Sequence, residues 1–170
     1  MRRLVPFMLL APFAAQAQTA PSLLVLGAGA TDVLEGGKRT AADLRLEYRA
    51  GVSLLPFGGE YVALRPWAGV EGTSRGSVWG GGGVLLDIPI WRFSLVPQAG
   101  IGAYGQGRGK ALGSPLEFRT GVELAYRFGD GSRVGAMFTH MSNADVARRN
   151  AGTEAIVVNY QVPLGWLIPR

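Results

Sequence analysis

Three polar residues near the C-terminal end of the chain have the types and spacing needed for nucleophilic catalysis. His140 and Ser142 lie on one predicted strand, and Glu154 begins the next. A base, a hydroxyl and a carboxylate are the groups that make a serine nucleophilic. Residues two apart share one face of a strand, and the other even-numbered positions of both strands are mostly apolar. We therefore expect all three side chains on an apolar face, which in a membrane barrel contacts lipid.

The stretches around these residues, 138–144 (FTHMSNA) and 150–154 (NAGTE), resemble the active-site region of lipid A 3-O-deacylases. These are outer-membrane barrel esterases of the acyloxyacyl-hydrolase-like family. Their pattern is H-x-S-N-A, a loop, then N-P-G-x-E, with a tyrosine further along the last strand. The chain departs from this pattern at Ala151, where the family usually has proline. It also extends beyond Trp166 to Arg170, whereas outer-membrane barrels commonly end on an aromatic residue.

The resemblance implies a role for each polar residue. Ser142 would be the nucleophile, His140 its general base, and Glu154 the group that orients and stabilises the imidazolium. Asn143 and Asn150 match family asparagines, and either amide is a candidate oxyanion donor. The implied reaction is hydrolysis of the 3-O-linked 3-hydroxyacyl chain of lipid A in lipopolysaccharide. With one histidine and no cysteine in the chain, we expect no metal site, and no cofactor is implied.

The rest of the chain predicts the scaffold for this site. Over residues 42–49 and 116–128, apolar side chains alternate with charges of both signs, the inverse of the pattern in a soluble barrel. Eight such runs are expected, at about 22–31, 40–49, 60–71, 76–88, 92–104, 115–128, 132–143 and 153–166. They predict an all-β protein, an eight-stranded antiparallel transmembrane β-barrel of the outer membrane. The tryptophans near the ends of runs are expected in interfacial aromatic belts.

The ends of the predicted barrel give its orientation. Asp130-Gly131 predicts a tight periplasmic turn, whereas the longer connection over residues 144–152 is expected outside the cell. The candidate site would then face the outer leaflet, where lipopolysaccharide lies. Cations in the outer loops are expected either to bind lipid A phosphates or to be solvated; they are Lys38, Arg39, Arg75, Arg108, Lys110, Arg148 and Arg149.

The N-terminus predicts export. Two arginines, an apolar core over residues 4–13 and an A-x-A site at 15–17 form a signal peptide over residues 1–17, too short for a membrane-spanning helix. Residues 18–170 would then form a single barrel domain. The formal net charge of +5 does not by itself indicate a nucleic-acid partner, and we expect none.

Two other classes of protein are alternatives to the esterase. A non-catalytic structural or adhesive outer-membrane barrel would allow the three polar side chains to diverge. A soluble lipocalin-like binder conflicts with the charged strand faces. The sequence leaves the oligomeric state open, with a homodimer among the states considered.

Overall fold

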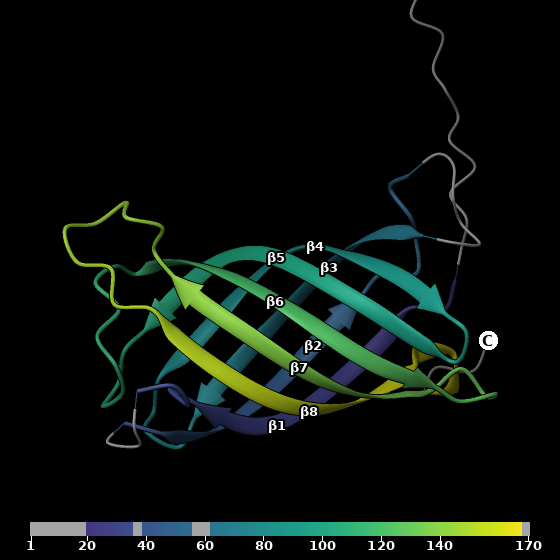
Figure 1. Cartoon of the computed structure of the whole chain (residues 1–170), viewed down its shortest axis with the longest axis horizontal. Coiled ribbons are helices and arrows are strands. Elements are labelled where there is room, and N and C mark those ends of the chain that lie inside the picture. Colours follow the sequence, from purple (N-terminus) through teal and green to yellow (C-terminus); the bar gives the residue numbers. More distant parts are fainter. Residues whose placement is uncertain (1–19, 36–38, 56–61, 168–170) are drawn as a thin grey trace, which may run out of the picture.

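The chain folds into a closed, antiparallel barrel of eight strands, joined in sequence order (Figure 1). The computed structural model describes residues 20–35, 39–55 and 62–167. The strands are β1 (Leu23–Thr31), β2 (Ala41–Arg49), β3 (Ala63–Thr73), β4 (Val78–Ile90), β5 (Phe93–Gly105), β6 (Leu116–Arg127), β7 (Arg133–Ser142) and β8 (Thr153–Pro163). A short 3-10 helix, η1 (Leu164–Trp166), follows β8. The predicted fold class is confirmed.

The predicted strands agree with those observed, apart from their ends. β3 begins three residues later than expected, and β8 ends at Pro163 because η1 begins at the next residue, Leu164. The predicted signal peptide, residues 1–17, lies outside the described residues. Within the described ranges, no helix is both long and apolar enough to cross a membrane.

The two faces of the wall differ in polarity as the alternation predicts. On β2, Leu44 is 66% exposed while its neighbour Asp43 is completely buried. On β6, Leu124 is 53% exposed and Glu123 is completely buried. The apolar side chains therefore point outward and the charged ones into the barrel, which is the arrangement of a barrel surrounded by lipid.

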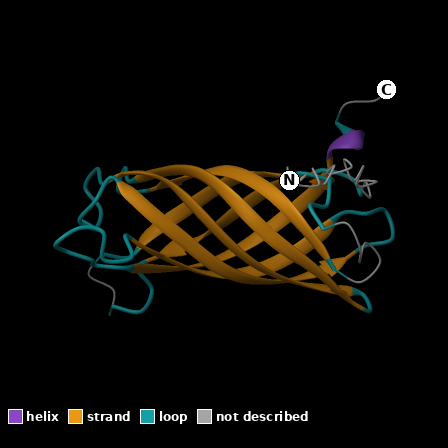
Figure 2. Cartoon of the chain, turned by 90° about the horizontal axis from the view of Figure 1, so that it is seen from above, coloured by secondary structure: helices purple, strands orange, loops and turns teal. Residues whose placement is uncertain are grey.

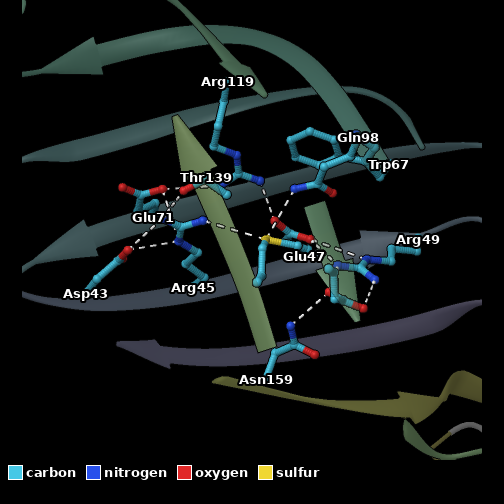
Figure 3. Close-up of polar contacts among 12 residues, drawn as sticks. Asp43, Arg45, Glu47, Arg49, Trp67, Glu71, Gln98, Arg119, Thr139 and Asn159 are labelled. Atoms are coloured by element: carbon cyan, nitrogen blue, oxygen red, sulfur yellow. Dashed lines mark hydrogen bonds and ion pairs between the residues drawn. The ribbon is translucent and has the colours of Figure 1, made fainter. Parts of the chain in front are cut away.

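Inside the barrel, charges of opposite sign alternate along β2 (Figure 3). Arg45 pairs with Asp43 at 2.7 Å, and Arg49 pairs with Glu47 at 3.1 Å. Other strands extend these pairs into a network, here called the inner ladder, which comprises Asp43, Arg45, Glu47, Arg49, Glu71, Arg119 and Glu123. Every member is at most 8% exposed. Paired charges therefore occupy the interior, where unpaired ones would be costly.

Two of the tryptophans expected in interfacial belts lie inside the barrel instead. Trp67 and Trp79 are 3% and 2% exposed, and the guanidinium of Arg119 lies 4.6 Å and 4.5 Å from their ring centroids. The belt prediction was wrong for these two because their positions on β3 and β4 face inward. Trp91 and Trp166, by contrast, are 81% and 50% exposed, beside the ends of β4 and β8.

The glycine-rich part of β4 and β5 makes room for these two rings. A Cβ at Gly100 would lie 2.6 Å from Cζ2 of Trp67, and one at Gly102 would lie 2.6 Å from Cε2 of Trp79. Side chains at these positions would therefore collide with the indoles. The run of glycines at 80–83 weakened the strand signal in the sequence, but it belongs to a continuous strand.

The connections between the strands gather at the two ends of the barrel (Figure 2). One end, here called the loop end, carries the connections 32–40, 74–77, 106–115 and 143–152. The opposite end, the turn end, carries the connection 50–62, of which residues 56–61 lie outside the described residues, the two-residue turn 91–92, the turn 128–132, the start of β1 and the end of β8. The tight turn predicted at Asp130-Gly131 is confirmed: Gly131 has φ +86° and its N–H donates to the Phe128 carbonyl at 3.1 Å. His140, Ser142 and Glu154 all lie near the loop end.

Candidate active site

His140 and Glu154 form a direct pair on the outer surface of the barrel. Strand register places them opposite each other on β7 and β8. Nδ1 of His140 lies 2.9 Å from Oε1 of Glu154, a hydrogen-bond distance. The imidazole side chain is 44% exposed and the carboxylate 17% exposed. With Nδ1 bonded to the carboxylate, Nε2 is the ring nitrogen left for proton transfer.

Ser142 lies on the same face of β7 as His140, one step closer to the loop end. It is partly exposed, like His140, while Met141 between them points inward and is buried. Its strand partner is Phe118 on β6. Among the described residues, Ser142 Oγ has no hydrogen bond to the imidazole. Nucleophile and base often approach more closely only when the substrate is bound.

Gly152, which the sequence reasoning left without a role, lies directly against the imidazole. A Cβ there would be 2.5 Å from Cε1 and 3.2 Å from Nε2 of His140. Even the smallest side chain would therefore displace the ring edge that carries the free nitrogen. The available signal was the glycine two residues before Glu154, but the sequence does not indicate what it contacts.

The two candidate asparagines differ in where their amides point. Asn143 is fully buried, and its Nδ2 donates to the carbonyls of Leu112 (3.1 Å) and Arg149 (2.7 Å). Asn150 is exposed; its Oδ1 accepts the backbone N–H of Asn143 at 3.1 Å, and its Nδ2 donates to Asp145 at 3.0 Å. The Asn143 side chain thus holds the 143–152 connection together, and only the Asn150 amide lies at the surface.

Of the cations expected to be free in the loops, Lys110 is buried. Its Nζ lies 2.9 Å from Asp32 and 2.8 Å from Glu35. Burial disfavours the ammonium, but hydrogen bonds to Glu35 and Asp32 and their negative charges outweigh it, so the pKa of Lys110 is raised above its usual value. The expectation that it meets phosphate or solvent was therefore wrong.

Other cations at the loop end remain at the surface. Arg39, Arg108, Arg148 and Arg149 are exposed, and Lys38 lies outside the described residues. Arg75 is half-buried, and its Nε donates to the Thr40 carbonyl at 3.4 Å.

An apolar hollow of about 340 Å³ lies on the outer wall, on the turn-end side of the candidate site. Its lining includes Val122, Leu124, Ala136, Phe138 and Ile156. Phe138 and Ile156 are a cross-strand pair, one step along the outer face from the pair of His140 and Glu154. In the part of the chain that the structure describes, no group of three or more His, Cys, Asp or Glu side chains could hold a metal ion.

Comparison with known protein families identifies the family to which the chain belongs. The profile of the family "Lipid A 3-O-deacylase (PagL)" matches residues 43–163, which include both strands of the candidate site, β7 and β8. The chain belongs to the lipid A 3-O-deacylase family. This confirms the resemblance seen in the sequence and places the chain among the carboxylic ester hydrolases. No curated protein matches the chain at a significant level.

Solved structures agree with the fold of the family. The chain is similar to the crystal structure of the outer membrane enzyme PagL, with 22% identity, coverage of 83% of this chain and 99% of that chain, and a TM-score of 0.61. It is also similar to a de novo designed transmembrane β-barrel (12% identity, coverage 85% and 97%, TM-score 0.57). A third match is the crystal structure of Neisserial surface protein A (8% identity, coverage 84% and 95%, TM-score 0.52). At these identities the likeness concerns the fold alone.

Proposed function

We propose that this deacylase is an outer-membrane serine esterase that hydrolyses the 3-O-linked 3-hydroxyacyl chain of lipid A. The observation that carries the proposal is the 2.9 Å contact between His140 and Glu154 on the outer wall. Ser142 lies on the same face of the same strand as His140. These are the three groups of a serine triad, and they lie on the side of the barrel that faces lipid.

The proposed reaction proceeds through an acyl-enzyme. Ser142 Oγ attacks the ester carbonyl and gives its proton to Nε2 of His140, while Glu154 stabilises the resulting imidazolium. The tetrahedral intermediate collapses as the imidazolium protonates the departing sugar oxygen. Water then attacks the acyl-enzyme while His140 accepts its proton. The imidazolium returns this proton to Ser142 Oγ as the ester bond to the enzyme breaks, and the free 3-hydroxy fatty acid leaves.

Of the two candidate oxyanion donors, we assign the role to Asn150. Its exposed Nδ2 has two N–H groups, and the bond to Asp145 occupies one of them. The amide of Asn143 is directed inward onto two carbonyls, so we assign it to holding the loop. The donor is expected to act by stabilising negative charge on the carbonyl oxygen.

Two features of the surface suit an acylated, phosphorylated lipid. The apolar hollow beside Phe138 and Ile156 would receive an acyl chain whose ester bond lies at the height of His140. Exposed arginines at the loop end, Arg148 and Arg149 among them, would bind phosphates in the headgroup region. In this proposal the loop end lies outside the cell and the substrate lies in the outer leaflet. Residues 1–17 are removed during export.

The test compares lipid A from cells with the wild-type protein, with Ser142→Ala, and without the protein, by mass spectrometry. We expect the wild type alone to remove the mass of one 3-hydroxyacyl group. Purified Ser142→Ala should lose several orders of magnitude in activity while retaining the heat-modifiable gel mobility of a folded barrel. The mass of the purified protein also shows whether it begins at Gln18. Near-normal turnover by folded Ser142→Ala would reject the serine mechanism.

A further inference from the structure

Leu112 is an apolar residue in a connection between strands, yet it is buried in the barrel. It lies in the 106–115 connection and is 1% exposed. Its side chain joins the apolar cluster inside the barrel, whose other buried members are Trp67, Trp79, Leu85, Val96 and Met141. Burial of an entire leucine side chain among rigid neighbours fixes the position of its backbone as well.

The carbonyl of this same residue accepts two hydrogen bonds from the connection that leads to the candidate site. Asn143 Nδ2 donates to it at 3.1 Å, and the backbone N–H of Ala151 donates at 3.3 Å. The next residue, Gly113, has φ +107°, and a Cβ on it would lie 2.0 Å from the Arg149 carbonyl oxygen. The two connections are therefore in direct backbone contact beside Leu112.

Both donors are adjacent in sequence to the site. Asn143 directly follows Ser142, and Ala151 directly precedes Gly152, the residue that borders the imidazole. Ala151 also stands where the family pattern has proline, which has no backbone N–H to donate. This chain therefore makes a bond to Leu112 that the usual family residue would not allow.

We propose that Leu112 is a positioning residue for the active site, a role that rests on the proposed esterase function. Its side chain is anchored in the barrel core, and its carbonyl orients the segments carrying Ser142 and Gly152. It does not contact the reacting atoms. The 106–115 connection is itself held in place by Lys110, through its ion pairs with Asp32 and Glu35, and by Tyr104 Oη, which donates to the Lys110 carbonyl at 2.7 Å.

The test uses two variants that remove the same group from the same apolar cluster. Leu112→Ala removes the anchor of the connection, whereas Leu85→Ala makes a similar cavity on β4, away from that connection. We expect Leu112→Ala to lower kcat by about 10- to 100-fold with KM nearly unchanged, since small displacements of catalytic groups have effects of this size. Leu85→Ala should keep kcat within about twofold once the activity is expressed per folded molecule, because it leaves the site geometry intact.

A spectroscopic readout separates positioning from general destabilisation. His140 is the chain's only histidine, so its imidazole resonances in NMR are assigned without ambiguity. They should shift or broaden in Leu112→Ala and keep their wild-type chemical shifts in Leu85→Ala. In Leu112→Met, which preserves the side-chain volume, they should again have the wild-type shifts. If Leu112→Ala does not fold, Leu112→Val and Leu85→Val give the same comparison with smaller cavities.

Equal kcat values for the Leu112 and Leu85 variants, with unchanged imidazole resonances, would overturn the positioning role. This result is distinguishable from failure of the proposed function, because the wild-type enzyme and Ser142→Ala are assayed alongside. If the wild type removes acyl chains and Ser142→Ala does not, the esterase mechanism stands whatever Leu112 does.

Discussion

Replacing Glu123 by glutamine should strongly destabilise the barrel without affecting catalysis. Glu123 is completely buried and accepts four hydrogen bonds: two from Arg49 (3.1 and 2.8 Å), one from Asn159 (2.9 Å) and one from Gln161 (2.6 Å). In Glu123→Gln one carboxylate oxygen becomes an NH₂ group, which would point at donors. The side chain would then keep about half of these bonds, and Arg49 would have Glu47 as its remaining acidic partner.

The expected magnitude follows from this count. Hydrogen bonds to a charged group contribute about 1.5–3 kcal/mol each, so losing two gives about 3–6 kcal/mol. A smaller desolvation penalty for the neutral amide offsets part of this loss, and breaking one partner of a buried ion pair typically costs about 3–5 kcal/mol. We therefore expect the free energy of unfolding to fall by about 3–5 kcal/mol in Glu123→Gln.

The assay measures urea-induced unfolding of the barrel in lipid vesicles, monitored by tryptophan fluorescence. The free energy of unfolding of each variant is compared with that of the wild type. Glu117→Gln is a matched control on β6. Glu117 also faces inward, but within the described residues neither of its buried oxygens has a hydrogen-bond partner. Because this change breaks no hydrogen bond and removes an unpaired buried charge, it should leave the free energy of unfolding unchanged or raise it. A similar, small change in both variants would refute the view that the inner ladder stabilises the barrel.

Two further predictions concern the outer wall. Gly152→Ala should lower kcat by about 100-fold because the added Cβ would push the His140 ring away from Ser142. Gly72→Ala is the control, since nothing lies within 4 Å of the carbon that it adds. Equal activity of the two variants would contradict the contact between residue 152 and the imidazole. Glu154→Ala should keep Ser142 and His140 in place yet lose up to about 10⁴-fold in turnover, by analogy with the serine triad. Steady-state ester release from purified lipid A measures both effects, and wild-type turnover in Glu154→Ala would exclude an orienting role.

The strands and their faces could be predicted because a period of two is a local property of the sequence. Residues 42–49 and 116–128 alternate clearly, and the structure places their even positions outside and their odd positions inside. Trp67 and Trp79 lie at odd-numbered, inward-facing positions, so their place near the end of a run does not predict their exposure. The space for their rings depends on glycines of neighbouring strands, a contact that no single run of sequence shows.

The candidate site was predictable for a similar reason. His140 and Glu154 are separated by one short connection, so the pairing of β7 and β8 brings them together. Lys110 and Leu112 were harder to interpret because their burial depends on partners distant in sequence, such as Asp32 and Trp79. The assignment of catalytic roles, the orientation in the membrane and the homodimer considered from the sequence stay predictions.

The alternation along β7 divides its residues into two sets that natural variation or engineering can change separately. Ala136 and Phe138 face outward beside the proposed acyl site, whereas the residue after each of them, Met137 or Thr139, faces inward and contacts Arg45 of the inner ladder. Changing the outward residues alters the shape presented to a lipid chain while the inner contacts remain. Under the proposed function, changes at even-numbered positions of this strand would alter acyl-chain preference, while the odd-numbered positions preserve the contacts with the inner ladder.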